Sequence, residues 1–320
     1  MRSRYQRLLL VLTGMLMAMC LISGCGSTTS KPTTKGDLQE ITLGVMPDTD
    51  SIPFIIAEQQ GYFEQEGLKV NIQHFKSAMD RDSALQSGNL DGAVSDMLAV
   101  GFARDGGFDV RVTSMTDGSY KLIAGKTTTA QTAAELAGQD VAVSRNTIIE
   151  YVTDQILAHD GLTGDSINKV IIPKIPTRLE MLQNGKLAAA TLPEPMASIA
   201  VHNGCRFITG SDELGINPGV IMFTQTATTD KKAEIQALYR AYNKAVDYLN
   251  TTERSQYIDA VIEASGFPAE AKEALRLPQY SRAILPKESD VNDCLNWLTQ
   301  KGLIHGQYSY GDIVLDLLTQ

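Results

Sequence analysis

The chain has 320 residues, of which 43% are hydrophobic and 20% are charged, and its formal net charge at pH 7 is −9. This acidic balance argues against nucleic acid as a partner, because nucleic-acid binding requires a basic face. About 280 residues follow the N-terminal segment described next, which is more than one hydrophobic core usually organises, so we expect two lobes.

The N-terminus predicts export. Three arginines precede an apolar run from Leu8 to Ile22, which is typical of a secretory signal. The run ends in the residues ISGC, which resemble the lipobox of bacterial lipoproteins, and a plain transmembrane anchor is the alternative. The resemblance implies that residues 1–24 are a signal peptide and that Cys25 carries the lipid. Loss of the three arginines would change the formal charge from −9 to −12.

Residues 25–38 are rich in Ser, Thr, Gly and Lys and predict a flexible tether, because they lack the apolar residues that build a core. From residue 41 onward, short apolar strands alternate with helices, an order that predicts an open, largely parallel sheet covered on both faces. The expected strands are 41–46, 69–75, 90–94, 110–114 and 120–124. The expected helices are 52–66, which Gly67 ends, 77–88 and 96–104.

A second run of the same kind follows. Its expected strands are 141–143, 170–172, 188–192 and 207–208, and its expected helices are 148–158, 179–184 and 196–202. Residues 219–223 predict an isolated strand, and no strand pattern appears in the last hundred or so residues. A clean helical period over 235–249 opens a helical C-terminal region. The sequence therefore predicts lobe one, lobe two, a return strand, and helices that close onto lobe one.

Three stretches resemble the substrate-binding proteins of ABC importers, in the group for nitrate, sulfonate, taurine and thiamine-precursor uptake. They read IPFIIAEQQGYFEQEGLKVNI, ALQSGNLDGAVSDMLAV and ATLPEPMASIA, and the resemblance extends from Ile41 to about Leu249. It implies an α/β, type II periplasmic-binding-protein fold of two lobes joined by two crossing segments, with a helical C-terminal tail. We place lobe 1 at 39–124 plus 219–320 and lobe 2 at 125–218, with crossings near Gly125 and Pro218.

The resemblance also implies a function. The chain would capture a small polar molecule, anionic or heteroaromatic, in the cleft between the lobes and deliver it to an ABC permease and its ATPase subunit. We expect a monomer outside the cytoplasm, anchored to the cell membrane by its lipidated cysteine, with no cofactor and no catalysis. The alternatives are a ligand-sensing surface module on the same fold and an enzyme of thiamine-pyrimidine synthesis. That enzyme needs a cysteine cluster, whereas Cys205 and Cys294 stand alone.

Ligand contacts in the first lobe are expected in the loops after its strands, because these loops meet at one edge of an open sheet. Each candidate also has a purely structural interpretation as a helix cap, or as a charge that interacts favourably with a helix dipole. Thr116, which lies shortly before the first crossing between the lobes, is a further candidate for contact with the ligand. These candidates are Pro47, Asp48, Asp50, Ser77, Ser95, Asp96 and Thr116.

In the second lobe, Arg145 and Asn146 lie between a strand and a helix, and a guanidinium there can pair in bidentate fashion with carboxylate, sulfonate or phosphate. Thr147 and Glu150 predict a capping box. Glu194, between two prolines, is a candidate for binding an amino or ring N–H group, with a purely structural role at the lobe interface as the alternative. We therefore expect a ligand with an acidic group.

Cysteine and histidine positions add little to this picture. Export permits a disulfide between Cys205 and Cys294, and two buried thiols are an equally good interpretation. The four histidines are scattered without metal-ligand spacing, so no metal site is expected.

Overall fold

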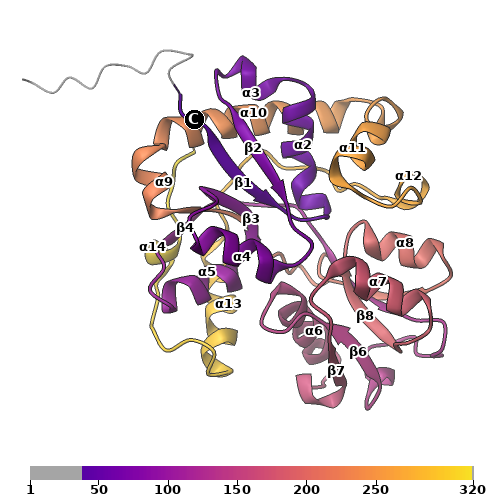
Figure 1. Cartoon of the computed structure of the whole chain (residues 1–320). Helices are drawn as coiled ribbons and strands as arrows, with labels where there is room; N and C mark the ends of the chain where they lie inside the picture. The colour runs from indigo at the N-terminus through magenta and orange to yellow at the C-terminus, as the bar shows by residue number, and fades with distance from the viewer. Residues whose placement is uncertain (1–37, 319–320) are drawn as a thin grey trace, which may run out of the picture. The chain divides into compact units, whose positions relative to one another are not determined.

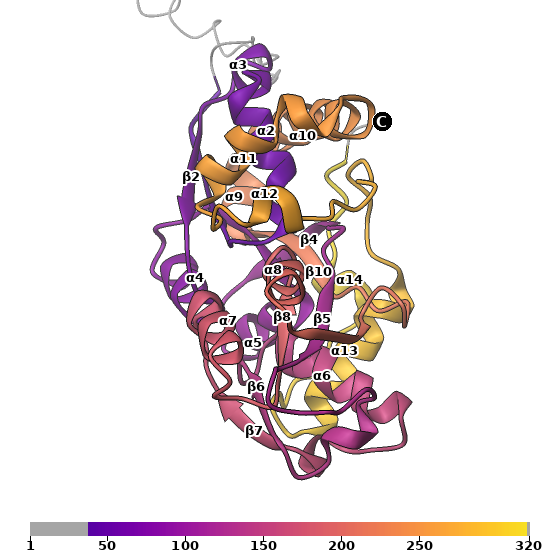
Figure 2. The same cartoon turned by 90° about the vertical axis from the view of Figure 1, so that its right-hand side faces the viewer.

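The computed structural model describes residues 38–318, so the expected signal peptide, the lipidation at Cys25 and nearly all of the tether lie outside the described residues. Residues 38–318 form two five-stranded sheets with helices packed around them (Figures 1 and 2). None of the helices in this range has both the length and the apolar composition needed to span a membrane.

The first sheet is parallel except for one strand. Its strand order is β2-β1-β3-β10-β4, and β10 runs antiparallel to both of its neighbours. The strands are β1 (Ile41–Val45), β2 (Val70–His74), β3 (Gly92–Asp96), β4 (Val110–Met115) and β10 (Gly219–Thr224). The return strand at 219–223 that the sequence predicts therefore completes this sheet between two strands from the first part of the chain.

The second sheet repeats this plan. Its order is β7-β6-β8-β5-β9, and here β5 is the antiparallel strand, paired with β8 and β9. The strands are β5 (Tyr120–Ala124), β6 (Asp140–Val143), β7 (Asn168–Ile171), β8 (Ala189–Pro193) and β9 (Arg206–Gly210). Each sheet thus receives its antiparallel strand directly after the chain crosses from the other sheet.

The position of β5 differs from the sequence-based boundary. We placed residues 120–124 in the first lobe and the crossing near Gly125, whereas Leu122 pairs with Thr191 of β8 and Thr209 of β9. The chain therefore enters the second sheet between Met115 and Tyr120. Apolar alternation shows that residues 120–124 form a strand but does not show which sheet it joins.

Helices cover both faces of the first sheet. On one face, Leu43, Ile221 and Phe223 belong to the same buried cluster as α2 and α10; on the other, Ala93, Val112 and Met222 pack with α5 and α13. The helices from this part of the chain are α2 (Ile52–Gln59), α3 (Tyr62–Gln65), α4 (Ala78–Gln86), α5 (Met97–Asp105), α9 (Gln225–Asp230) and α10 (Lys232–Thr251).

One expected helix is divided in two. The sequence predicts a single helix that Gly67 ends, but Gly61 has a φ of 64° and separates α2 from α3. Gly67 has a φ of 74° and lets the chain turn from α3 into β2 within a few residues. A left-handed φ is strained for most side chains, which is why glycine occupies both turns.

The second sheet is covered in the same way. Ala190 and Leu192 of β8 belong to the cluster that includes residues of α7 and α8, and Val141 and Val143 of β6 pack with α6. These helices are α6 (Ile148–His159), α7 (Ile175–Gln183) and α8 (Met196–His202). Four 3-10 turns lie among the described residues: η1 (Thr49–Ser51), η2 (Ala134–Leu136), η3 (Gly164–Ser166) and η4 (Arg254–Gln256).

The C-terminal helices contact both lobes, whereas the sequence predicts that they close onto the first lobe. α12 packs against α8 and α13 packs against α5. The ring of Trp297 on α13 meets the ring of Tyr151 on α6 edge to face, with centroids 5.6 Å apart. The helices of this region are α11 (Ile258–Ser265), α12 (Ala271–Ala274), α13 (Glu288–Gln300) and α14 (Tyr310–Ile313).

Candidate functional site

A small buried cavity lies where the carboxyl ends of strands from both sheets face each other. Its volume is about 40 Å³, and its walls come from the loops after β1 and β6, from the carboxyl end of β3, and from α4 and α7. This is the place where open α/β sheets generally bind ligands. The polar and charged side chains around it are Asp48, Asp50, Arg81, Ser95, Asp96, Tyr120, Ser144, Thr147 and Arg178.

Asp50 joins the first lobe to the segment that leads into the second. Its Oδ1 accepts a hydrogen bond of 2.7 Å from the backbone N–H of Gly118, and its Oδ2 accepts one of 3.0 Å from the hydroxyl of Tyr120 on β5. Burial raises the pKa of this carboxyl, and these hydrogen bonds act in the opposite direction. Asp50 is therefore a fixed acceptor at the base of the cavity.

Asp48 lies two residues away and is held less firmly. The hydroxyl of Ser51 donates to Asp48 Oδ1 at 3.0 Å. Burial, and secondly the charge of Asp50, raise the pKa of Asp48 to about 8. Its carboxyl is therefore largely protonated at neutral pH, and a cationic group placed next to it would favour the ionised form.

Asp96 has a structural role in addition to its place at the cavity. It caps α5 by accepting a hydrogen bond of 2.9 Å from the N–H of Ala99, and it lies 3.8 Å from Nη2 of Arg81. Arg81 also pairs with Asp82 at 2.8 Å and donates to the carbonyl of Val94. Burial raises the pKa of Asp96, and the charge of Arg81 opposes that effect. Arg81 thus differs from a free cation because it has carboxylate partners, although its Nη2 makes no hydrogen bond within the described residues.

Arg178 is the basic group that the second lobe brings to the cavity. Its side chain is 0% exposed, and it donates to the carbonyls of Thr191 at 2.9 Å and Ile172 at 2.7 Å. Within residues 38–318, Nη2 has no hydrogen-bond partner and the guanidinium has no ion-pair partner. Burial lowers its pKa to about 10, so it remains charged at neutral pH. A buried positive charge without an anionic partner, and a buried N–H group without an acceptor, are both costly in free energy. The unpaired Nη2 therefore points to a ligand.

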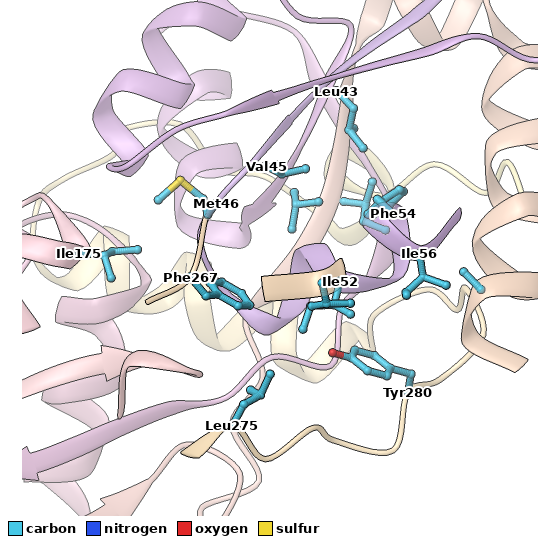
Figure 3. Packing of buried hydrophobic residues seen from close by; sticks show 14 of the residues in the cluster. Leu43, Val45, Met46, Ile52, Phe54, Ile56, Ile175, Phe267, Leu275 and Tyr280 are labelled. Carbon is cyan, nitrogen blue, oxygen red and sulfur yellow. The ribbon is translucent and has the colours of Figure 1, made fainter. Parts of the chain in front are cut away.

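The two lobes contact each other around this cavity. The N–H of Thr49 donates to the carbonyl of Glu194 at 2.9 Å, and the N–H of Ile175 donates to the carbonyl of Lys76 at 3.1 Å. Apolar contacts add to these bonds, because Met46 and Ile175 belong to one buried cluster and lie on facing elements (Figure 3). The cavity is therefore closed by contacts from both lobes.

Four of the ten predicted ligand residues, Asp48, Asp50, Ser95 and Asp96, line the cavity, and the other six do not. Ser77 is buried and caps α4, accepting from the N–H of Asp80 at 3.2 Å. Thr116 is buried where the two crossing segments meet, since its N–H donates to the carbonyl of Gly219. Pro47 and Glu194 line other, larger depressions.

Arg145 and Asn146 are exposed and lie outside the cavity wall. Asn146 has a φ of 57°, and its N–H donates to Oε2 of Glu150 at 2.7 Å. This bond replaces the predicted capping box, in which the same carboxylate would accept from Thr147. Thr147 still caps α6 by accepting from the N–H of Ile149 at 3.2 Å.

The sequence analysis missed Arg178, although a signal for it exists. Arg178 shares the buried face of α7 with Ile175, Leu179 and Leu182, at the spacing i, i+3, i+4, i+7. An arginine in the apolar stripe of an amphipathic helix is unusual and suggests a buried polar role. We began that helix at residue 179, and Arg178 therefore fell outside it.

Neither thiol nor metal chemistry emerges from the described residues. Cys205 and Cys294 are both buried and free, so they are two separate thiols and do not form a disulfide with each other. Within residues 38–318 there is no group of three or more His, Cys, Asp and Glu side chains that could hold a metal ion.

Known proteins are similar to this chain in sequence and in fold. A curated relative from Brachyspira hyodysenteriae, named as an ABC transporter periplasmic binding protein, is 21% identical over 255 residues, 75% of this chain and 73% of the relative. The periplasmic aliphatic sulphonate-binding protein SsuA of Escherichia coli has a similar fold, with a TM-score of 0.73 and 18% identity over 88% of this chain and 93% of SsuA.

The periplasmic nitrate-binding protein NrtA of Synechocystis has a TM-score of 0.70 and 14% identity, over 84% of this chain and 83% of NrtA. These likenesses confirm the predicted two-lobed periplasmic-binding fold. The model of the NMT1-like family matches residues 34–263, well over half of the sequence. The chain therefore belongs to the NMT1-like family.

Proposed function

We propose that the protein is the extracytoplasmic solute-binding component of an ABC importer. The observation that carries this proposal is the buried polar cavity between the lobes, which has charged side chains from both lobes in its wall. The names of the curated relative and of the similar structures support it, because they describe binding proteins of ABC transporters and for sulfonate and nitrate. The ligand is a small polar molecule, anionic or heteroaromatic.

The mechanism is closure of the two lobes around the ligand. A ligand that contacts both lobes favours the closed state only by its higher affinity for that state. The contacts between Thr49 and Glu194 and between Lys76 and Ile175 would form and break in this motion. The segments 116–119 and 211–218 link the two sheets and are the proposed hinges.

We also propose the cellular setting. Cys25 is lipidated and anchors a monomer to the outer side of the cell membrane, where it delivers its ligand to a permease and that permease's ATPase subunit. These proposals rest on the sequence of the leader and on the family. Metabolic labelling with a fatty-acid analogue tests the anchor, and a Cys25→Ala variant that still carries the label would contradict it.

The predicted ligand contact of Arg145 stays a prediction. Its exposed position makes contact possible only for a ligand that reaches beyond the cavity described here. Calorimetric titration of Arg145→Ala with an identified ligand tests it. A loss of affinity would support the contact, and unchanged affinity would contradict it.

Thermal-shift screening tests the proposed function. The compounds are nitrate, sulfonates, carboxylates, pyrimidines and flavins, and a true ligand raises the melting temperature because it binds only the folded state. At a concentration one hundred times its Kd, the expected gain is about 2.7 kcal/mol. If no compound in a broad metabolite library shifts the melting temperature, the proposed solute-binding function is wrong.

A further inference from the structure

The wall of the cavity carries a buried cation from the second lobe and buried carboxyl groups from the first lobe. Arg178 of the second lobe is fully buried, and its Nη2 lacks any partner among residues 38–318. Asp48 and Asp50 of the first lobe are 7% and 3% exposed, and no ion pair reaches either carboxyl within the described part of the chain. Among the described residues, Arg178 therefore has no anionic partner, and the only cation that acts on Asp48 is Arg81, which is itself paired with Asp82.

Arg178 and Asp50 are also held in place by hydrogen bonds. Arg178 is held by its two bonds to carbonyl oxygens, and Asp50 is held by the N–H of Gly118 and the hydroxyl of Tyr120. Ser95 adds a further polar group, since its hydroxyl is buried at the cavity wall without a recorded partner among the described residues. Fixed polar groups of this kind are typical of a preorganised binding site.

We propose that the cavity takes a compact molecule with two unlike ends, an acidic group that pairs with Arg178 and a basic or hydrogen-bond-donating group that pairs with Asp48 and Asp50. This proposal rests on the proposed solute-binding function and narrows its ligand class. A ligand of this kind bridges the lobes, because its acidic end bonds to α7 and its other end bonds to the loop after β1. Arg178 and Asp48 then become the residues that determine specificity.

A ligand with only one kind of charge fits this arrangement less well. A simple anion at Arg178 would lie in a cavity that also contains Asp48, Asp50 and Asp96, and it would leave the first two without a cation. A simple cation at the aspartates would leave Arg178 without a partner. Since a buried unpaired charge is costly, the molecule that satisfies both ends has the greater affinity.

The size of the cavity limits the distance between the two ends. About 40 Å³ admits only a few non-hydrogen atoms in this arrangement of the lobes, because one water molecule requires roughly 10–15 Å³ on the same measure. We therefore expect the smallest compounds of this class, in which only about one or two carbons separate the acidic group from the basic group.

Calorimetric titration with matched compounds tests the proposal. The two-ended compounds are amino carboxylates and amino sulfonates with one or two carbons between the two groups, including β-alanine, and the one-ended relatives of β-alanine are propionate and n-propylamine. At least one two-ended compound is expected to bind at least ten-fold more tightly than both of its one-ended relatives. Equal affinity for either relative, or binding by no two-ended compound, would overturn the proposal.

Variants locate the two ends, with the best two-ended compound from this panel as the probe. Arg178→Gln is expected to lower its affinity at least ten-fold while raising the relative affinity for the amine. Arg206→Gln is the control, because Arg206 also lies in the second lobe and bonds to the carbonyls of Thr128 and Ala130, away from the cavity. Equal losses in both variants would overturn the role of Arg178.

Proton release provides a readout that a merely structural role would not change, and it remains available if Arg178→Gln fails to fold. Burial keeps Asp48 largely protonated, and the charged groups that face it are Asp50 on its own loop and Arg81 on α4. A basic group bound beside Asp48 expels that proton. Titration of the probe at pH 7 in buffers of different ionisation enthalpy should show release in the unaltered protein and a loss of release in Asp48→Asn. Equal release in both would overturn the role of Asp48.

The results also separate this proposal from the broader one. If no two-ended compound binds but another compound from the broad library does, the two-ended ligand class is wrong and solute binding stands. If nothing in either set binds, both proposals are wrong.

Discussion

Asp48 illustrates what burial does to a single carboxyl. Its pKa is raised from 3.8 in the unfolded chain to about 8 in the folded protein, so between these values the folded state holds a proton that the unfolded state has lost. Folding stability from this group is therefore complete below about pH 4 and is lost as the pH rises toward 8. The raised pKa values of Asp50 and Asp96 act in the same direction.

Replacing Asp48 with Asn is expected to reduce this pH dependence. The free energy of unfolding should fall less steeply between pH 5 and pH 7 in the variant, by up to about 1.4 kcal/mol per pH unit, because one titrating group has been removed. Urea unfolding at several pH values measures it. Asp230→Asn, at an exposed position, is the control. Parallel pH profiles for Asp48→Asn and the unaltered protein would contradict the assigned burial effect.

Residue positions could be predicted from the sequence where a local rule applied. Asp48, Asp50, Ser95 and Asp96 follow predicted strands, and they line the cavity, as the rule that strand ends form the ligand-binding edge suggests. The same rule does not say which way a loop side chain points, and Arg145, which it also selects, lies outside the cavity wall. Arg178 follows no strand end directly, so only the apolar face of α7 could have revealed it.

At the scale of elements, Ser77 shows how a candidate contact can be a helix cap. Its hydroxyl accepts from the N–H of Asp80, and Ser77→Ala should lower the free energy of unfolding by about 1 kcal/mol. Chemical denaturation measures the change. Ser83→Ala on the same helix is the control, because Ser83 is exposed and bonds only to the carbonyl of Met79. Similar small changes in both variants would mean that the cap contributes little.

The first crossing segment depends on a glycine. A Cβ added to Gly118 would lie 2.0 Å from Oδ2 of Asp50, so the carboxylate of Asp50 or the backbone at residue 118 must shift, and the hydrogen bond between them is disturbed. Gly118→Ala is therefore expected to cost about 1–3 kcal/mol of unfolding free energy and to weaken ligand binding by displacing Asp50.

Denaturation and calorimetry of Gly118→Ala measure both effects. The control is Gly311→Ala, since a Cβ at Gly311 meets nothing within 4 Å and its φ is not left-handed. Gly311→Ala should change stability by less than about 1 kcal/mol. Normal stability and normal affinity in Gly118→Ala would show that the segment adapts freely and does not position Asp50.

Helices and strands could be predicted because each has a local sequence pattern. Which strands pair with one another was harder to predict. The strand at 120–124 was found with correct bounds but assigned to the wrong lobe, since strand pairing is decided by residues distant in sequence, here Thr191 and Thr209. The division between α2 and α3 at Gly61 was also missed, because a glycine near a helix end fits both a cap and a break.

At the scale of the whole molecule, α13 ties the two lobes together. Trp297 is 7% exposed and packs on Tyr151 of α6, while Lys301, just after α13, pairs with Asp154 of α6 at 2.5 Å. Trp297→Ala should lower the free energy of unfolding by about 3–5 kcal/mol, as expected for a buried aromatic side chain. Circular dichroism is the measurement, because the chain has one tryptophan and the variant has none.

Phe207→Ala is the control for this prediction, because Phe207 is an aromatic residue of the second sheet that is 37% exposed. Phe207→Ala should lower the free energy of unfolding by much less than Trp297→Ala does. Equal costs would show that the contact between α13 and α6 has no special importance for stability. The sequence did not predict this contact, since it joins residues about 150 positions apart and no local pattern records such a distance.

The central claim is that a small molecule binds in the cavity between the two sheets, held by groups from both. The most direct measurement is a crystal structure of the protein with the compound that gives the largest thermal shift. The account predicts electron density for that compound between the loop after β1 and α7, in contact with Asp48 and Arg178. Density at another place, such as the depression between α8 and the segment 273–276, with this cavity unchanged, would contradict it.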